Sequence, residues 1–230
     1  MTLGPWLEVD LGPGVRAGFS TVAAGNLGLG LGDEPDAVAE RRRAAERWAG
    51  GPVAWGRQVH GAAVHLATAG GDDVAACDAM VATQVGLAVL VADCVPVLVA
   101  DPAAGVVGTI HAGRAGVVAG VVPAAVGALQ RAGARELRAV VGPAICGACY
   151  EVPAAMRDDV DAKVPGTAST TSWGTPALDL PRAVTRQLAE LGVRVEDLGL
   201  CTRTDARFFS HRGVRDGRPA GRVAGIVRLV

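Results

Sequence analysis

Residues 87–111 read LAVLVADCVPVLVADPAAGVVGTIH, and this stretch decides the fold. The runs 87–91, 95–100 and 106–111 are short, almost continuously apolar and rich in β-branched residues, which is typical of buried strands. Residues 101–105, Asp-Pro-Ala-Ala-Gly, have the composition of a tight turn, so we expect the last two runs to form an antiparallel hairpin. In a continuous strand, the neighbouring side chains of Asp93 and Cys94 would point to opposite faces.

The rest of the chain mixes strand and helix patterns without a regular βαβ order. Strand patterns are expected in 1–31 (hairpins or strand-rich loops), 53–64 (a strand pair meeting around Gly61) and 137–141. Helices are expected at 33–48, 116–132 (where Pro123 marks a kink or a first turn), 153–163 and 181–192 (capped by Asp179). Residues 164–174, rich in Thr, Ser and Gly, are the candidate mobile loop. This pattern predicts an α+β fold, and the lack of repeats and linkers predicts one domain over residues 1–230.

Composition excludes several classes of partner. The formal net charge of −1 gives no electrostatic footprint for nucleic acid or for an anionic membrane. The apolar stretch 85–100 is short for a membrane span and is interrupted by Asp93 and Pro96. Five Cys at irregular spacings do not form a disulfide framework, and the first residues lack the pattern of a signal peptide. We therefore expect a cytoplasmic protein with reduced thiols.

Three residues in the middle of the chain form a candidate metal site. His60, Cys94 and His111 each lie at the end or beginning of an apolar segment. Two imidazoles and a thiolate suit zinc, with a fourth position left for water or substrate. Without metal, Cys94 and a histidine would instead form a thiolate nucleophile with its base. The spacings of 34 and 17 residues require tertiary folding to bring the three together, so ordinary turn histidines and a buried cysteine are also compatible with the pattern.

Further residues are candidates for contacts with a substrate. Cys146 and Cys149 have CxxC spacing without a second pair, and Tyr150 suits a pocket wall. Phe208 and Phe209, followed by His211 and Arg212, would provide a ring-stacking surface with a polar edge for a heteroaromatic base. Arginines such as Arg57, Arg203 and Arg212 would neutralise a phosphate. The candidate substrate contacts are Arg57, Gln58, Asp93, Arg114, Cys149, Tyr150, Phe209, His211 and Arg212. Asp93 could instead support a metal ligand from outside the coordination shell or accept hydrogen bonds from backbone amides near the turn.

An ordered series of motifs resembles the bacterial laccase-domain family, also called YfiH-type or multicopper polyphenol oxidase-like. The matching segments are Phe19-Ser20-Thr21, Asn26-Leu27-Gly28, Gly32-Asp33, 57–61 (RQVHG), 78–81 (DAMV), 92–96 (ADCVP), His111-Ala112-Gly113, 142–145 (GPAI), 149–152 (CYEV), 209–212 (FSHR) and Gly221-Arg222. The resemblance implies a layered α/β sandwich with mixed sheets flanked by helices. It also implies that His60, Cys94 and His111 are the metal-binding catalytic residues, and that the segments around Cys149 and His211 shape the pocket.

The resemblance also implies an activity, with alternatives. The family activity is phosphorolysis of adenosine, inosine, guanosine and methylthioadenosine, with some adenosine deamination, so zinc, a purine nucleoside and phosphate are the expected cofactor and substrates. Alternatives are a zinc- or cysteine-dependent amide hydrolase in peptidoglycan-precursor editing, a metal-stabilised binding protein without turnover, and a copper-dependent polyphenol oxidase. The last is disfavoured because four His cannot furnish several imidazole-rich copper sites. Two positions depart from the family pattern: Arg114-Ala115 replaces Trp-Arg after His-Ala-Gly, and Val22 replaces an Arg, with the segment to Asn26 shortened.

Overall fold

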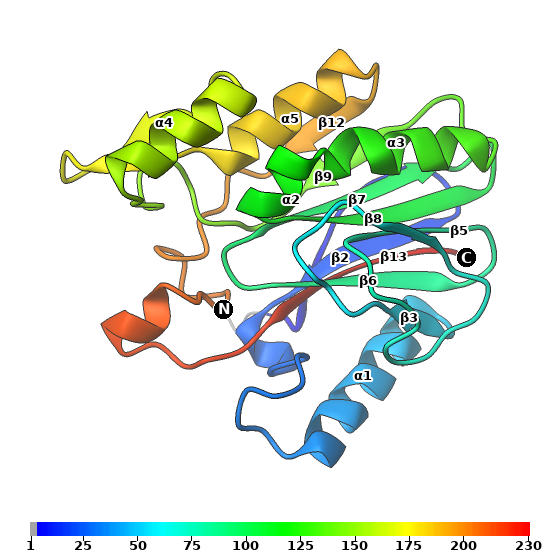
Figure 1. The fold of residues 1–230 in the computed structure, drawn as a ribbon. Coiled ribbons are helices and arrows are strands. Elements are labelled where there is room, and N and C mark those ends of the chain that lie inside the picture. The colour runs from blue at the N-terminus through cyan, green and yellow to red at the C-terminus, as the bar shows by residue number, and fades with distance from the viewer. Residues whose placement is uncertain (1–3) are drawn as a thin grey trace.

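Two β-sheets pack face to face at the centre of the computed structural model, which describes residues 4–230 (Figure 1). In chain order the strands are Trp6–Glu8 (β1), Val15–Ser20 (β2), Val53–Trp55 (β3), Val64–Leu66 (β4), Ala79–Ala82 (β5), Gly86–Val91 (β6), Val95–Asp101 (β7), Val106–Ala112 (β8), Arg138–Val141 (β9), Ala168–Thr170 (β10), Pro176–Leu178 (β11), Arg194–Asp197 (β12) and Val223–Leu229 (β13). The five-stranded sheet has the order β1-β2-β13-β6-β3, and the six-stranded sheet has the order β12-β9-β7-β8-β5-β4. Both sheets are mixed, because β3, β4 and β12 pair in parallel with their neighbours and the other pairs are antiparallel.

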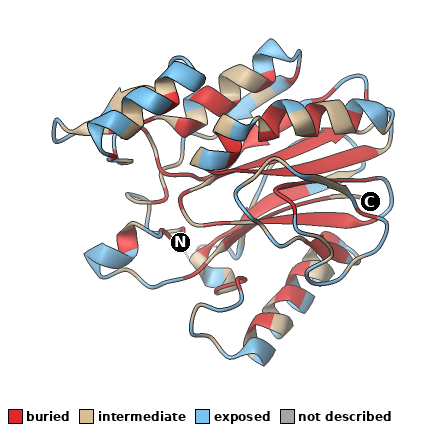
Figure 2. Ribbon diagram, in the orientation of Figure 1, coloured by how far each residue is buried: buried red, intermediate tan, exposed pale blue. Residues whose placement is uncertain are grey.

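Helices cover the outer faces of both sheets. They are Pro35–Ala49 (α1), Arg114–Ala119 (α2), Val121–Arg131 (α3), Ala154–Lys163 (α4) and Leu180–Glu190 (α5), with 3₁₀ turns at Val22–Ala24 (η1) and Gly213–Asp216 (η2). Apolar residues of α2, α3 and α5 pack on the six-stranded sheet, and α1 packs on the five-stranded sheet. The molecule therefore has four layers, and the central strands β5, β6, β7 and β8 are buried almost throughout (Figure 2).

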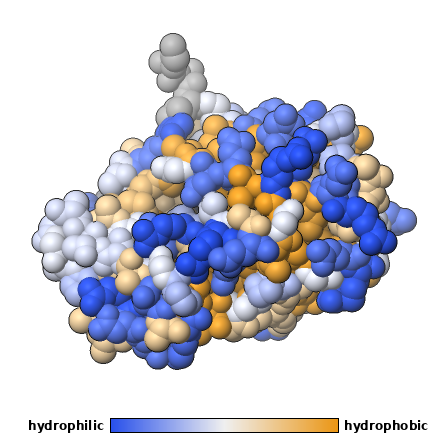
Figure 3. All heavy atoms as spheres, turned by 90° about the horizontal axis from the view of Figure 1, so that it is seen from above, coloured by the Kyte–Doolittle hydropathy of each residue, from blue (hydrophilic) through white to orange (hydrophobic). Residues whose placement is uncertain are grey.

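Helix ends follow from local sequence. Pro35 stands in the first turn of α1, and Gly50 ends this helix in the left-handed region at φ 85°. Gly120 does the same between α2 and α3, so the helical segment expected at 116–132 is two helices, with Pro123 in the first turn of the second. Asp179 caps α5 by accepting a hydrogen bond from the amide of Arg182. Seen from above, the face that carries α2, α3, α4 and α5 has hydrophilic side chains interspersed with apolar areas (Figure 3).

The expected hairpin of residues 95–111 is confirmed. β7 and β8 are antiparallel, with Val95 opposite Ala112 and Asp101 opposite Val106. The α+β class with mixed sheets flanked by helices is also confirmed. The strand pattern within 1–31 is a β1-β2 antiparallel pair, although residues 1–3 lie outside the described part of the chain.

The runs 87–91 and 95–100 are strands, as expected, and between them the chain bends from one sheet to the other, with Asp93 at φ 85°. Two other local predictions are wrong. β3 and β4 do not pair with each other, because β3 joins the five-stranded sheet and β4 the six-stranded sheet. Residues 164–174, the candidate mobile loop, include β10, which forms a small hairpin with β11.

None of the helices within residues 4–230 has the length and apolarity needed to cross a membrane.

Candidate active site

His60, Cys94 and His111, which we call the trio, meet where the chain crosses between the sheets. Their ligand atoms all lie within 4.8 Å of one another, and His60 Nε2 is 3.9 Å from Cys94 Sγ. The two imidazole rings are nearly perpendicular, with centroids 4.8 Å apart. His60 follows β3, Cys94 lies between β6 and β7, and His111 lies in β8. Segments that are distant in sequence are therefore joined by the tertiary fold.

Asp78 positions both histidines. Its Oδ1 accepts hydrogen bonds from His111 Nδ1 at 2.8 Å and from the backbone amide of His60 at 2.8 Å. Its Oδ2 accepts from the amides of Gly61 and Val59 at 2.7 and 3.3 Å. These bonds hold His60 in the left-handed region, at φ 59°, and direct His111 Nε2 away from the carboxylate. Although burial raises the pKa of Asp78, the hydrogen bond from His111 and those from the amides hold it below its usual value.

The electrostatics of the trio favour a thiolate. Burial raises the pKa of Cys94, but hydrogen bonds from His111 and His60 outweigh this effect and lower it to about 6. For His111, burial lowers the pKa, and the bonds to Asp78 and Cys94 more than compensate and raise it. Because zinc binds cysteine as the thiolate, Cys94 is already close to the protonation state that a metal requires.

The space around the trio suits a metal ion. A Cβ atom at Gly113 would lie 2.9 Å from His60 Cδ2, 3.2 Å from Cys94 Sγ and 3.5 Å from His111 Cε1. Gly113 therefore keeps a small cradle open among all three ligands. Tetrahedral zinc separates a nitrogen and a sulfur ligand by about 3.5 Å, given bonds of about 2.0 and 2.3 Å. The donor set and the 3.9 Å contact between His60 and Cys94 fit such an ion.

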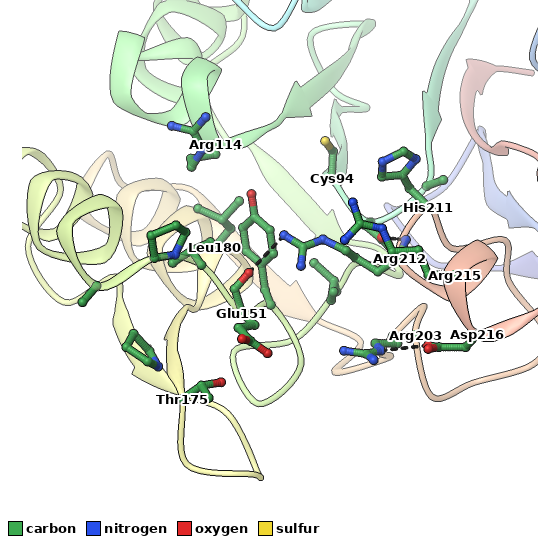
Figure 4. Close-up of a pocket in the computed structure, with 18 residues that line it drawn as sticks. Cys94, Arg114, Glu151, Thr175, Leu180, Arg203, His211, Arg212, Arg215 and Asp216 are labelled. Carbon is green, nitrogen blue, oxygen red and sulfur yellow. Dashed lines mark hydrogen bonds and ion pairs between the residues drawn. The ribbon is translucent and has the colours of Figure 1, made fainter.

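A cavity of about 940 Å³ opens beside Cys94. Its wall includes Cys94 and Asp93 from the crossover, Arg114 from α2, and His211 and Arg212 from the segment before β13 (Figure 4). The lining also includes Ile145, Tyr150, Glu151, Arg203, Arg215 and Asp216. Through Cys94, the trio therefore borders a space large enough for a nucleoside-sized molecule, although His60 and His111 do not line it.

Arginine side chains give this cavity a positive wall. Arg212 Cζ lies 5.2 Å from the centroid of the Tyr150 ring, and its Nη2 donates to the carbonyl of Glu151 at 3.0 Å. Arg203 pairs with Asp216 at 3.2 Å. By contrast, no carboxylate within residues 4–230 forms an ion pair with Arg114. Among the lining arginines, Arg203 is paired with Asp216, whereas Arg114, Arg212 and Arg215 form no ion pair within the described residues and can offer their charge to an anionic ligand.

Asp93 organises the wall of the cavity. Its carboxylate accepts hydrogen bonds from Thr202 Oγ1, Ser210 Oγ and the amide of Arg212, each at 2.7 Å. These bonds tie the crossover that carries Cys94 to the segment that carries His211 and Arg212. The left-handed backbone of Asp93 directs this carboxylate, a geometry that a continuous strand would not permit.

The structure separates the other candidate contacts. Tyr150, His211, Arg212, Arg114 and Asp93 line the cavity. Four candidates lie outside its lining: Arg57 is exposed and pairs with Asp73, Gln58 bonds the backbone of Leu90 in both directions, Cys149 is buried behind the wall, and Phe209 is buried in the core.

Two residues that matter here, Asp78 and Gly113, carry no clear functional signal in the sequence. Asp78 appeared only as the first residue of a matching motif, and its place before a strand resembles an ordinary turn carboxylate. Gly113 follows His111 by two residues, and glycine after a histidine carries little signal alone. Both roles become visible only when the three ligands converge.

Comparison with known proteins agrees with this architecture. Residues 14–230 match the family model described as "Multi-copper polyphenol oxidoreductase laccase". A purine nucleoside phosphorylase of Streptomyces griseus is 50% identical over 225 residues, which cover 92% of this chain and 90% of that protein. One from Streptomyces coelicolor is 50% identical and covers 89% and 87%. A crystal structure of a Neisseria meningitidis protein superposes with a TM-score of 0.84 at 30% identity, covering 98% of this chain and 99% of that one.

Proposed function

This chain belongs to the multi-copper polyphenol oxidoreductase laccase family, and from that premise we propose that it is a zinc-dependent purine nucleoside phosphorylase. The name carried by its relatives supports the reaction class. The observation that carries the proposal is the trio at the edge of a large cavity whose wall includes the unpaired Arg114. Such a wall suits phosphate, and the cavity suits the nucleoside.

The reaction joins phosphate to the sugar. A phosphate oxygen forms a bond to C1′ of the ribose as the bond from C1′ to the purine nitrogen breaks. The electron pair of the broken bond goes to the purine, which takes up a proton, and the products are the free base and ribose 1-phosphate, or 5-methylthioribose 1-phosphate from methylthioadenosine. Adenosine, inosine, guanosine and methylthioadenosine are the proposed substrates.

Each group in the cavity has a role in this proposal. Arg114 and Arg212 bind the phosphate, and the Tyr150 ring, stacked against Arg212, forms a flat wall for the base. His60, Cys94 and His111 would hold the zinc, oriented by Asp78. When bound, zinc supplies Lewis-acid polarisation of a substrate atom. Arg114 lies one position before the Arg of the family pattern, and its place on the cavity wall supports its taking over that role.

Adenosine deamination is proposed as a side activity. Replacing the 6-amino group by oxygen consumes water and releases ammonia, so it needs no phosphate. It would use the same cavity and the same trio.

A second candidate function is amide hydrolysis by Cys94 itself, as in an enzyme that edits peptidoglycan precursors. The lowered pKa of Cys94, near 6, is the observation that favours it, since a thiolate with two adjacent histidines is a suitable nucleophile. Retention of amide-cleaving activity after complete removal of metal would distinguish this function from the first.

The test combines metal analysis with a nucleoside panel. Purified protein is expected to hold one zinc per chain at the trio and to release free base only when phosphate is added. Inosine formed from adenosine without phosphate would report the side activity. His60→Ala is expected to abolish turnover, whereas His65→Ala, which changes a β4 residue outside the site, keeps it. Release of base at equal rates with and without phosphate would contradict the phosphorylase proposal.

A further inference from the structure

A second cluster of three cysteines lies behind the cavity wall. The sulfur atoms of Cys146, Cys149 and Cys201 all lie within 4.8 Å of one another. The chain has five cysteines, so three of them converge here, while Cys94 belongs to the trio and Cys77 lies alone in the core. All three are free thiols.

Backbone hydrogen bonds hold the cluster together. β9 and β12 run parallel, and the segments that follow them stay paired: the amide of Ala144 donates to Leu200, and the amide of Thr202 donates to Ala144. This pairing places Cys201 beside Cys146, whose amide donates to Cys201 Sγ at 3.4 Å. A turn then returns Cys149 to Cys146, with its amide bonded to the Cys146 carbonyl at 3.0 Å. The three sulfurs are therefore arranged by the backbone before any ligand binds.

We propose that Cys146, Cys149 and Cys201 form a second metal site that binds one Cu(I) ion through three thiolates. Three sulfur ligands around a metal–sulfur bond of about 2.3 Å lie about 4 Å apart, so only a small contraction from the observed arrangement is needed. Each thiol releases its proton to solvent as its sulfur binds, and copper does not change its oxidation state.

The donor set favours copper over zinc. Thiolates are soft ligands that select Cu(I) and zinc. Structural zinc sites almost always have four protein ligands. No histidine or carboxylate within residues 4–230 joins the three sulfurs in this cluster. A three-coordinate ion is therefore the better fit. Cys146 is partly exposed, which gives the ion access.

The position of the cluster links it to the cavity. Ile145 and Tyr150, on either side of the Cys146–Cys149 turn, line the cavity. Arg203, two residues after Cys201, also lines it and donates to the Cys149 carbonyl at 3.3 Å. An ion bound to the three sulfurs would stiffen the wall from behind without contacting the substrate.

The test uses full-length Cys94→Ser protein, fully reduced and anaerobic, so that the trio no longer competes. Cu(I) is titrated against the chelator bathocuproine disulfonate. We expect one Cu(I) per chain, with ultraviolet thiolate-to-copper absorption. Adding Cys146→Ser or Cys201→Ser should weaken binding at least 100-fold, whereas adding Cys77→Ser should leave it unchanged.

Three outcomes would overturn the proposal. The first is that Cys94→Ser protein with its three thiols reduced takes up no Cu(I). The second is that adding Cys146→Ser or Cys201→Ser leaves the Cu(I) affinity of Cys94→Ser protein unchanged. The third is that the protein binds Zn(II) in preference to Cu(I). X-ray absorption of the loaded Cys94→Ser protein does not depend on how the further variants fold. It should show a shell of three sulfurs, and nitrogen ligands in that shell would place the copper elsewhere.

Discussion

Asp78 Oδ1 lies 2.8 Å from His111 Nδ1, and the same oxygen accepts the backbone amide of His60. One carboxylate thus sets the orientation of one candidate ligand through its ring and of another through its backbone. Because such partners fix the tautomer and direction of a ligand, the metal affinity of this site should depend on a residue that does not touch the metal.

Asp78→Asn is expected to weaken metal binding by about 10–100-fold. The neutral Asn side chain cannot hold His111 by a charged hydrogen bond, and its single oxygen cannot accept from the three backbone amides as well as a carboxylate does. Competition with a chelator measures the affinity. Asp73→Asn, which removes an exposed partner of Arg57, is the matched control and should retain the metal. Unchanged affinity in Asp78→Asn would contradict the positioning role.

Gly113→Ala should impair the site without unfolding the protein. The new methyl group would touch all three ligands, while φ −74° and ψ 164° are accessible to alanine. We expect loss of bound metal and a fall in turnover of at least 10-fold, while the stability to denaturant, compared between the metal-free proteins, changes by less than about 1 kcal/mol. Gly127→Ala in α3, where the Cβ meets only the flexible end of Arg131, serves as the control and should be neutral or stabilising.

Cys94 in metal-free protein should react with iodoacetamide at low pH. Its pKa is lowered from the ordinary 9.0 to about 6, so the thiolate forms as the pH rises through 6 and the rate reaches a plateau below pH 8. Peptide mass spectrometry after timed alkylation follows this single site. Cys77, whose pKa burial raises to about 11, is the internal control and should stay unmodified. A midpoint near 9 for Cys94 would show that the histidines do not stabilise its thiolate.

Arg114→Gln should raise the KM for phosphate by about 10-fold or more, since it removes a lining arginine whose charge no carboxylate in residues 4–230 neutralises. The KM for the nucleoside should change less. Steady-state kinetics with each substrate varied in turn separates the two effects, and Arg43→Gln on exposed α1 is the control. Equal effects on both KM values would argue against a phosphate contact.

Asp101→Asn tests a structural carboxylate far from the cavity. Asp101 accepts hydrogen bonds from the amides of Arg135, Glu136 and Ala104; burial raises its pKa, but these bonds keep it below 3.8. The folded protein therefore favours the ionised form, and this contribution to stability is present above pH 3.8 and lost as the pH falls further. At pH 7 the variant should be less stable by about 1–3 kcal/mol in urea unfolding. The difference in unfolding free energy between the variant and the unmutated protein should narrow below pH 3.8. A difference that stays constant with pH would contradict the link between ionisation of Asp101 and stability.

The sequence predicts well what is local. The hairpin of β7 and β8 follows from two apolar runs and a turn of Asp, Pro and Gly, all within 17 residues. The expected helix cap at Asp179 is likewise set by neighbouring residues. What spacing alone could not predict is which sheet each strand joins. β3 and β4 look like a pair along the chain, yet hydrogen bonds to β6 and β5 place them in different sheets.

The same limit applies to the site. His60, Cys94 and His111 were candidates by residue type, and the fold brings their ligand atoms within 4.8 Å. Their shared support by Asp78 depends on a contact between residues 33 positions apart. The role of Asp93 depends on a left-handed backbone that an apolar run does not predict. Long-range pairing and local strain therefore account for what the sequence analysis missed.

The trio spans the boundary between the two sheets: β3 and β6 precede His60 and Cys94 in one sheet, and His111 lies within β8 of the other. A cation bound there would hold the two sheets together, because a partly opened form with the sheets separated could not keep all three ligands on the ion. Metal release and sheet separation would then be thermodynamically linked, and each tenfold rise in free metal above the dissociation constant would add about 1.4 kcal/mol to the stability of the closed layers.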